Sequence, residues 1–558
     1  MVYEFDAGDV LQPVMYPAMA RSFRAAGFQW ATQFAYDPLA TAYGNTEYQT
    51  HYLNLAYTPA KAISLLIASK AFHQLPRSKS YGTYPNSASF GAFRIDYRNA
   101  LSEMNTKEEF YYTNTTSSMP QNAKNLLHVA GVGSSPVVTY KGSGAYFLDK
   151  VANGVWRLEV MPDAIMINDP FAKASPKKEV VRVQYNAQAM EINLQDLGKN
   201  FSVRGLNQGN TYTASAQNGA FQIQPGTYLI TKAGVKNART TGAIGTLKLN
   251  EFVAPKPVSN DVFVKHAPFK EVSAGKSYEV SAQVVGVSAN DKVILQANNT
   301  AATWKIIPME AKSATNYVAQ IPVEMVVPGE ISYKIIVQKS NGEQVAFPGN
   351  HKGDTGAWDY YHNDSWKTIV AAANGGLSLF NAATDRNIFV FPNLWRADER
   401  QLTTTTQPGQ MVLKLTAKEP TKEQVLGFQQ FVGDKLAGRE TELDSFQKLV
   451  VRVKVSGTSQ PVAMKATLIT QDAAAFAAKA TINGQFQDIE IPLSSLQADS
   501  FILLPRAYPG FQYFSFQSAK PGTFKLKDAE KLQITLGGEA AGLPEGCSLE
   551  IEQVWLIK

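Results

Sequence analysis

Glu4 is the first residue whose type and position could do chemistry. It lies in the short apolar run Val2–Phe5, which is followed at once by a loop that contains Asp6 and Asp9. In enzymes built from parallel strand–helix units, catalytic groups gather where strands end and the following loops begin. Glu4 is therefore a candidate catalytic carboxylate. The pattern alone favours an ordinary solvated acid near the N-terminus, and that alternative stays open.

A second group of candidates lies in and after segment 28–34, which alternates large and small side chains as a strand does. Trp30 and Gln33 interrupt this segment, and Tyr36 and Asp37 follow it. An aromatic face can stack on a sugar ring, while amide and carboxylate groups bond to its hydroxyls. These four residues are candidates for carbohydrate binding. Each of them, taken singly, also fits a core position beside hydrogen-bonded neighbours.

A third group lies in the connector 351–366, which is rich in glycine, histidine and aromatic residues. Trp358, Tyr361 and Trp366 are interleaved there with hydrogen-bonding side chains, a composition that suits carbohydrate binding. The same composition occurs at domain interfaces, where aromatic rings pack and keep their polar ends wet. Further along the chain, Trp395 could belong to a second sugar-binding face or edge.

Metal, nucleotide and esterase motifs are missing from the sequence. It contains no HExxH or CxxC pair, P-loop, dinucleotide fingerprint or Gly-x-Ser-x-Gly elbow. His351, Asp354, His362 and Asp364 could gather around a metal, but their spacing matches no known ligand template, so we expect no site there. No cofactor is predicted, except that calcium could be held at loop oxygens of a β-sandwich.

The elements that must position the first two groups alternate between strand and helix. Residues 12–26 place apolar side chains on one face, and Gly27 follows where a helix C-terminal glycine belongs. Thr58 offers an N-cap and Pro59 a first helical position for a second helix, which stops near Pro76. Strand, helix, strand, helix is the order of a parallel α/β fold.

The rest of the chain consists of short predicted strands separated by turn residues, so we expect a multidomain, mainly β protein. The pattern favours a β-sandwich over 78–253 and, beginning with a proline-bearing linker, an immunoglobulin-like domain over 254–350. Residues 351–558 return to an antiparallel pattern typical of a jelly roll.

Composition argues against several classes of protein. The 558 residues are 44% hydrophobic and 18% charged, which argues against disorder and against a coiled coil. The net charge of +6 is spread along the chain without a basic block, so nucleic acid is not an expected partner. No run approaches the roughly 18 apolar residues of a membrane span. The N-terminal residues do not resemble a signal peptide, and the single Cys547 excludes an internal disulfide framework.

The runs VYEFDAGDV, MYPAMARSF, GFQWATQFAYDP and YLNLAYTPAKA resemble the last two strand–helix units of a (β/α)8-barrel glycoside hydrolase. The resemblance is to the large retaining clan in which a glutamate nucleophile ends the seventh strand and a tryptophan lies on the eighth. With stretches such as GAYFLDKVANGVWRLEVMPDA (144–164) and QPGTYLIT (224–231), the whole chain resembles multidomain secreted or membrane-associated proteins of polysaccharide-degrading Bacteroidetes, in which β-domains follow a barrel. The resemblance implies that residues 1–77 are a barrel remnant, Glu4 the nucleophile and Trp30 the strand-eight aromatic.

The resemblance also implies that part of the catalytic machinery is missing. A retaining glycosidase needs two carboxyls about 5–5.5 Å apart, and the family's acid/base comes from a fourth strand that would precede Glu4. We therefore expect the C-terminal portion of a polysaccharide-degrading glycoside hydrolase, inactive as this chain. The complete protein would be secreted, periplasmic or on the cell surface.

Two other hypotheses remain open at this point. In the first hypothesis, the chain is a non-catalytic carbohydrate-binding or cell-surface scaffold protein, whose partner is again a polysaccharide or oligosaccharide. Alternatively, a second chain supplies the rest of the barrel. The sequence does not determine the oligomeric state.

Overall fold

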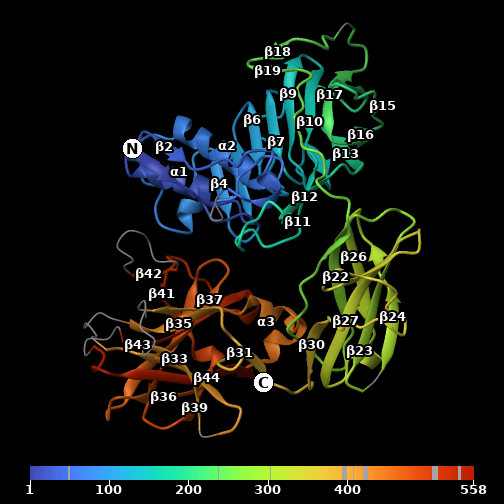
Figure 1. Ribbon diagram of the computed structural model, residues 1–558. Coiled ribbons are helices and arrows are strands. Elements are labelled where there is room, and N and C mark those ends of the chain that lie inside the picture. The colour runs from blue at the N-terminus through green and yellow to red at the C-terminus, as the bar shows by residue number, and fades with distance from the viewer. Residues whose placement is uncertain are drawn as a thin grey trace. The chain divides into compact units, whose positions relative to one another are not determined.

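The computed structural model describes the chain except for residues 48–50, 237, 302, 392–398, 406, 419–424, 505–512 and 538–541. The described residues form two compact units, unit 1 (Met1–Lys265) and unit 2 (His266–Lys558), coloured from blue to green and from green to red in Figure 1. Strands make up most of the regular structure in both units, which confirms a mainly β protein with several sheets. Among the helices described, none combines the length and the apolar character needed to cross a membrane.

Unit 1 begins with a small parallel β-α-β arrangement. β1 (Val2–Phe5) pairs in parallel with β2 (Ala31–Gln33), and α1 (Met15–Ala25) lies between them in sequence. The Phe5 ring packs edge-on against the rings of Tyr16 and Phe23 on α1. Among the described residues this sheet has two strands, so the barrel remnant over 1–77 stays a prediction.

Both predicted helices form close to the expected positions. α1 ends just before Gly27, whose φ of 85° favours glycine. α2 (Pro59–Gln74) begins at the predicted proline. The Thr58 hydroxyl does not cap this helix, because it bonds to the backbone of Asn54 instead.

The helices share a core with a large antiparallel-rich sheet. Buried Ile63 and Ile67 of α2 belong to the same hydrophobic cluster as Phe93 and Met104 of the sheet. The sheet has ten strands in the order β15-β14-β17-β10-β9-β7-β6-β5-β4-β3. Their bounds are β3 (Ser89–Phe90), β4 (Phe93–Asp96), β5 (Leu101–Asn105), β6 (Glu109–Tyr112), β7 (His128–Gly131), β9 (Tyr146–Ala152), β10 (Val155–Val160), β14 (Phe201–Gly205), β15 (Thr213–Ser215) and β17 (Gly226–Lys232).

A second core joins part of this sheet to a three-stranded sheet, β16-β13-β8. Leu158 and Ile230 of the large sheet cluster with Met190 and Phe221 of the small one. The remaining strands of this part are β8 (Val138–Tyr140), β11 (Asp163–Met166), β12 (Val181–Gln184), β13 (Gln188–Ile192), β16 (Ala220–Ile223), β18 (Ala243–Ile244) and β19 (Leu247–Lys248). The described part of 78–253 contains strands and no α-helix, as the turn pattern predicted.

Unit 2 begins with two sheets. The larger has the order β21-β30-β27-β23-β24, with β28 pairing β27 and β29 pairing β28. The strands of these two sheets that lie within His266–Lys558 are β21 (Glu271–Ser273), β22 (Tyr278–Val285), β23 (Lys292–Asn299), β24 (Trp304–Pro308), β25 (Glu310–Ala311), β26 (Asn316–Ile321), β27 (Gly329–Gln338), β28 (Gln344–Phe347), β29 (His351–Lys352) and β30 (Trp366–Ala371). Alternate residues of β23 and β27 are buried, among them Leu295, Ala297, Tyr333 and Ile335.

Unit 2 continues as a sandwich of two six-stranded sheets, β33-β34-β44-β36-β39 with β31 on β44, and β32-β35-β43-β37-β38-β40. Leu379, Val451 and Val554 of the first sheet share one core with Phe428 and Ile534 of the second. The bounds are β31 (Leu377–Asn381), β32 (Ile388–Phe391), β33 (Arg400–Thr404), β34 (Met411–Thr416), β35 (Val425–Phe431), α3 (Gly433–Ala437), β36 (Lys448–Ser456), β37 (Val462–Thr470), β38 (Ala475–Ile482), β39 (Gln487–Pro492), β40 (Gln497–Asp499), β41 (Phe501–Ile502), β42 (Ser515–Phe516), β43 (Ala529–Gly537) and β44 (Ser548–Ile557).

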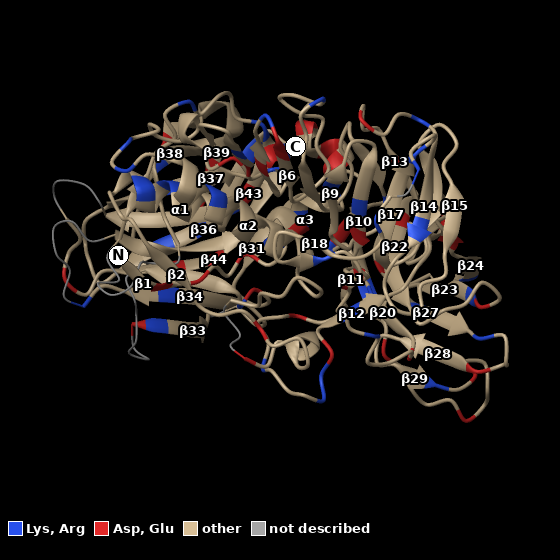
Figure 2. Cartoon of the chain, turned by 90° about the horizontal axis from the view of Figure 1, so that it is seen from above, with Lys and Arg blue, Asp and Glu red and all other residues tan. Residues whose placement is uncertain are grey.

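Charged residues of both signs are interspersed along the strands, as the blue and red segments of Figure 2 show. This distribution agrees with the even spread of charge in the sequence.

Candidate functional site

The candidate site is a groove over the outward face of β24, β23 and β27 in unit 2. Strand pairing places Trp304 opposite Asn298, and Asn298 opposite Ser332. The next row places Ile306, Gln296 and Lys334 side by side. The register of three strands therefore brings an indole, two amides, a hydroxyl and an ammonium onto one surface.

Strand alternation explains why these polar residues face outward. Successive side chains of a strand point to opposite faces, and Val293, Leu295 and Ala297 of β23 are buried. Their neighbours Gln296 and Asn298 must then lie on the other face, where they are half-buried.

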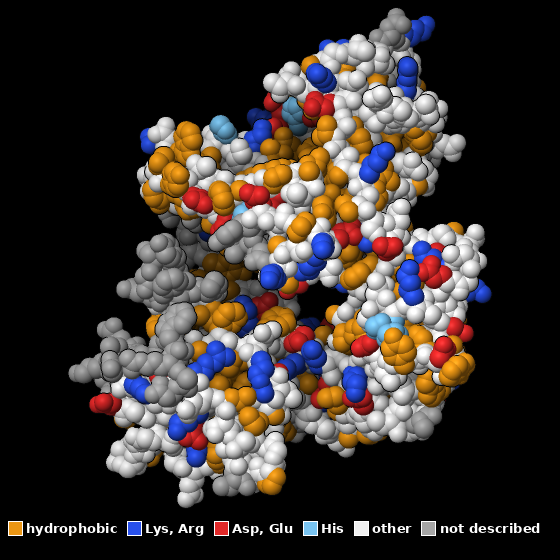
Figure 3. Space-filling model, in the orientation of Figure 1, with side chains coloured by type: hydrophobic (Ala, Val, Ile, Leu, Met, Phe, Trp, Pro, Cys, Tyr) orange, Lys and Arg blue, Asp and Glu red, His pale blue; other side chains and the backbone are white. Residues whose placement is uncertain are grey.

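The connector between β29 and β30 forms the wall of the groove. The Lys334 ammonium donates a hydrogen bond to the His362 carbonyl at 2.6 Å and lies 5.3 Å from the centre of the Tyr360 ring. Burial lowers the pKa of Lys334 and raises the pKa of Tyr360. These contacts hold the connector against β27, and the open groove beside it has a volume of about 410 Å³. Figure 3 shows histidine side chains beside hydrophobic ones on this part of unit 2.

The described lining of the groove offers surfaces for binding a ligand, but it does not contain the pair of carboxyl groups that hydrolysis of a sugar requires. The Trp304 side chain is 60% exposed, so it offers a flat apolar surface to a ligand. The described lining residues are Gln296, Asn298, Trp304, Ser332, Tyr333, Lys334, Thr355, Tyr360, His362, Asn363, Ser365 and Lys367. Since none of these is a carboxylate, the described groove lacks the general acid and nucleophile of a glycosidase.

The predicted catalytic residue lies in unit 1. Glu4 is exposed on β1. Trp30 just precedes β2, is 63% exposed, and donates from its indole nitrogen to the Thr32 hydroxyl at 2.7 Å. The Gln33 amide donates to the Tyr16 hydroxyl at 3.1 Å and to the Ala35 carbonyl at 3.3 Å.

The other two predicted residues of unit 1 hold the loop before α2. The Tyr36 hydroxyl accepts a hydrogen bond from the Leu55 N–H at 2.8 Å, while its ring stays exposed. Asp37 is 1% exposed, and its carboxylate accepts from the Leu53 N–H at 2.6 Å. Burial raises the pKa of Asp37. The Asp37 side chain is thus enclosed by the protein, whereas Trp30 and Tyr36 offer surface to a ligand.

The predicted residues of the connector fall into different surroundings. Trp358 and Tyr361 are 97% and 79% exposed, and neither is among the groove-lining residues. Trp366 begins β30, and its ring centre lies 4.9 Å from that of His266 and 6.2 Å from that of Tyr333. Trp395 lies outside the described residues.

Sequence reasoning missed Trp304 and the polar row beside it. Strand β23 comes from the stretch DKVILQAN, and its parity separates Gln296 and Asn298 from the buried positions. That parity was the signal from which the sequence could have identified Gln296 and Asn298. The residues that lie beside them on the neighbouring strands depend on the pairing register.

Three potential metal ligands converge beside the groove. Among the described residues, His351, His362 and Asp364 place one ligand atom each within 4.8 Å of one another. The sequence had argued against a metal here, because the spacing fits no template. Two nitrogen donors and one oxygen suit a transition metal better than calcium. This cluster is therefore not the calcium site that the sequence allowed, and calcium binding stays a prediction.

Comparisons with known proteins found no matching protein-family model and no match among curated proteins. Solved structures show weak likeness. A family 11 carbohydrate-binding module from Clostridium thermocellum, in complex with a β-1,3-1,4-mixed-linked tetrasaccharide, is 11% identical, with 33% of this chain and 95% of that chain covered and a TM-score of 0.22. An exo-β-agarase is 14% identical, with 32% and 24% covered and a TM-score of 0.21. With such low scores, nothing about the ligand of this chain is inferred from either structure.

Proposed function

We propose that this chain is a non-catalytic carbohydrate-binding protein, and that the groove over β24, β23 and β27 holds a segment of a polysaccharide or oligosaccharide. The observation that carries the proposal is the exposed Trp304 ring beside a row of amide, hydroxyl and ammonium groups. The ring packs on the apolar face of a sugar, and the polar row bonds to its hydroxyls.

The size and chemistry of the groove support this function. Its volume of about 410 Å³ falls in the range of about 300–1,000 Å³ that is usual for ligand sites. The described lining offers hydrogen-bond donors and acceptors but no carboxylate pair, which favours binding over hydrolysis. A polysaccharide ligand also supports a secreted, periplasmic or cell-surface location for the complete protein.

The test is a panel of soluble glucans, xylans, galactans and mannans, screened by affinity electrophoresis and followed by calorimetry with the best ligand. We expect Trp304→Ala to weaken binding by at least about tenfold, because a buried aromatic ring contributes about 1.5–3 kcal/mol and 1.4 kcal/mol is a factor of ten. The matched control is Trp30→Ala, because Trp30 has nearly the same exposure, 63% against 60%, and lies in unit 1.

The two variants separate the groove from the site that the sequence predicted. Loss of binding in Trp304→Ala with retention in Trp30→Ala supports the groove. The reverse result would place the ligand at β1 and β2 and contradict this proposal, as would a chain that binds no glycan in the panel.

A second candidate function is the C-terminal portion of a retaining glycoside hydrolase. It is supported by the parallel pairing of β1 and β2 around α1, with Trp30 exposed just before β2 and Tyr36 exposed after it. Parallel strands joined by a helix are the building unit of barrel enzymes. In this hypothesis Glu4 acts as nucleophile, and the chain alone has no turnover.

A further inference from the structure

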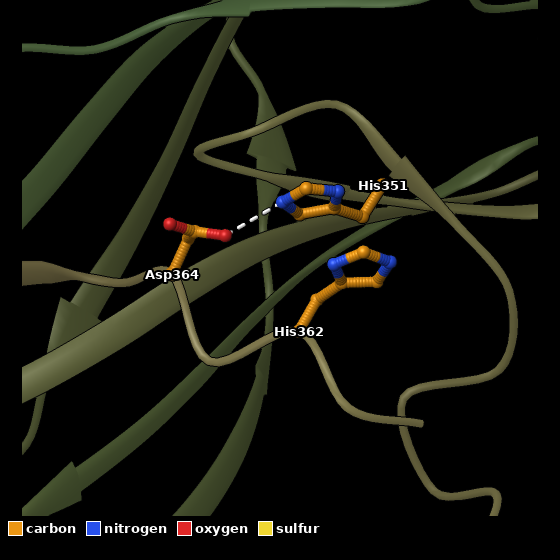
Figure 4. Close-up of side chains that lie close together, drawn as sticks. All are labelled: His351, His362 and Asp364. Carbon is orange, nitrogen blue, oxygen red and sulfur yellow. Dashed lines mark hydrogen bonds and ion pairs between the residues drawn. The ribbon is translucent and has the colours of Figure 1, made fainter. Parts of the chain in front are cut away.

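The strongest unassigned cluster in unit 2 consists of His351, His362 and Asp364. Figure 4 shows the two imidazole rings lying one above the other, with the carboxylate at one edge of the pair. The ring centres are 3.7 Å apart and the planes differ by 7°. The Asp364 carboxylate lies 2.6 Å from Nε2 of His351.

The fold holds both arms of this cluster in place. His351 lies in β29, where it pairs with Ala346 of β28. On the other arm, the His362 carbonyl accepts the hydrogen bond from Lys334 of β27. A side chain at position 349 would collide with the His351 ring, and Gly349 has a φ of 98° that favours glycine. The position of the His351 ring therefore depends on a glycine two residues before it.

The donor set points to one class of ion. Imidazole nitrogens suit zinc, copper and nickel, whereas calcium and magnesium take oxygen ligands. Zinc binds nitrogen at about 2.0–2.1 Å, so donors around a tetrahedral zinc lie roughly 3.3 Å apart. The three donor atoms are within 4.8 Å of one another. Binding would turn the side chains, because two imidazole rings that lie 7° from parallel do not point their in-plane nitrogens at one ion. His351 and Asp364 are 24% and 57% exposed, which leaves them room to turn.

We propose that His351, His362 and Asp364 bind one divalent transition-metal ion of the zinc class, with water in the remaining position. The ion would link β29 to the segment that precedes β30. Because His362 also lines the groove, the ion would lie at the groove wall. The metal site does not depend on the ligand proposed for the groove, since its three donors come from the protein.

The test uses the full chain after removal of metal with a chelator. Zinc is titrated by calorimetry in competition with a chromophoric chelator, and we expect one zinc per chain. His351→Ala and His362→Ala should each weaken binding by at least about tenfold, since even partners of metal ligands are worth 10–100-fold. The matched control is His73→Ala, because His73 is an exposed histidine near the end of α2 and should leave zinc affinity unchanged.

Copper gives a second readout that a merely structural role would not produce. The electron paramagnetic resonance spectrum of the copper-loaded chain should show coupling to two imidazole nitrogens, reduced to one in either histidine variant. Asp364→Asn removes a donor charge from an exposed residue and provides a test even where a histidine variant folds poorly.

Three outcomes would overturn the proposal. The first is no zinc binding by the wild-type chain, and the second is binding that survives in the double variant His351→Ala/His362→Ala. The third is calcium binding that is lost in the same variants, because calcium does not prefer nitrogen donors. Zinc binding without glycan binding would support this proposal and contradict the proposed function. Glycan binding without zinc binding would do the opposite.

Discussion

Arg439 of unit 2 is a fully buried guanidinium whose charge is matched by carboxylates. It donates to Glu271 at 2.6 Å and to the Gly376 carbonyl at 2.8 Å, and it forms an ion pair with Glu442. Glu271 belongs to β21, so the arginine ties that strand to the segment before β31. Removal of one partner from such a buried pair leaves an uncompensated charge, which is strongly destabilising.

Glu442, one of the two acids of this network, has a pKa well below its ordinary value. Burial alone would raise the pKa of Glu442, but hydrogen bonds from Arg439, Ser273 and Lys558 outweigh burial and lower it to about 2. A carboxyl with a depressed folded pKa stabilises the fold above its ordinary pKa near 4.5. That stabilisation is lost as the pH falls through the folded pKa.

We predict that Glu442→Gln lowers the free energy of unfolding by about 2–3 kcal/mol at about pH 7. The gap between wild type and variant should shrink as the pH falls from about 5 toward 2, because the wild-type carboxyl then also becomes neutral. Urea unfolding of both proteins at a series of pH values measures this gap.

Glu490→Gln is the matched control for that series, because Glu490 forms an exposed ion pair with Lys448. Exposed pairs contribute about 0–1 kcal/mol, so this variant should stay close to the wild type. A Glu442→Gln penalty that persists undiminished at low pH would contradict the assignment.

At the scale of elements, the start of α1 depends on a side chain outside the helix. One carboxylate oxygen of Asp9 accepts hydrogen bonds from the N–H groups of Val14 at 2.9 Å and Met15 at 2.8 Å. The first N–H groups of a helix have no partner within the helix, so Asp9 acts as a cap from a distance. Burial raises the pKa of Asp9, although these hydrogen bonds and Lys61 oppose the shift.

We predict that Asp9→Ala destabilises unit 1 by about 1 kcal/mol, the usual cost of losing a cap, and that Asp9→Asn costs less because it keeps an acceptor. The control is Glu4→Ala, an exposed acid of β1, which should stay within about 0.5 kcal/mol of the wild type. Urea unfolding monitored by circular dichroism compares the three variants. Equal losses in Asp9→Ala and Glu4→Ala would show that the cap contributes nothing.

At the scale of the whole molecule, the two units carry different candidate sites. The groove with Trp304 belongs to unit 2, whereas Glu4 and Trp30 belong to unit 1. The proposed binding function and the hydrolase hypothesis can therefore be tested on the same chain without one variant affecting both.

We predict that the chain does not turn over aryl glycosides, whatever the sugar. A retaining mechanism needs two carboxyls about 5–5.5 Å apart, and none of the described groove-lining residues is a carboxylate. Release of nitrophenol from a panel of aryl glycosides checks this prediction. Turnover that disappears in Glu4→Gln would show instead that the chain is a competent hydrolase.

Local patterns predicted the elements of this protein well. The apolar stripe and terminal glycine of α1, the proline that starts α2, and the strand content of 78–253 depend on neighbours within a few residues. Such signals are local because a helix repeats every 3.6 residues and a strand every two. The burial of Asp37 could not be predicted in this way, since the loop that encloses it comes from residues near Leu53.

The sequence by itself determined the mainly β character of the chain and its two N-terminal helices. Only the tertiary structure decided that Trp304 lies beside Gln296 and Asn298 and that His351 meets His362. Parity is a property of one strand, whereas register and loop closure depend on contacts between segments that the sequence separates. The candidate sites of this protein follow from those contacts.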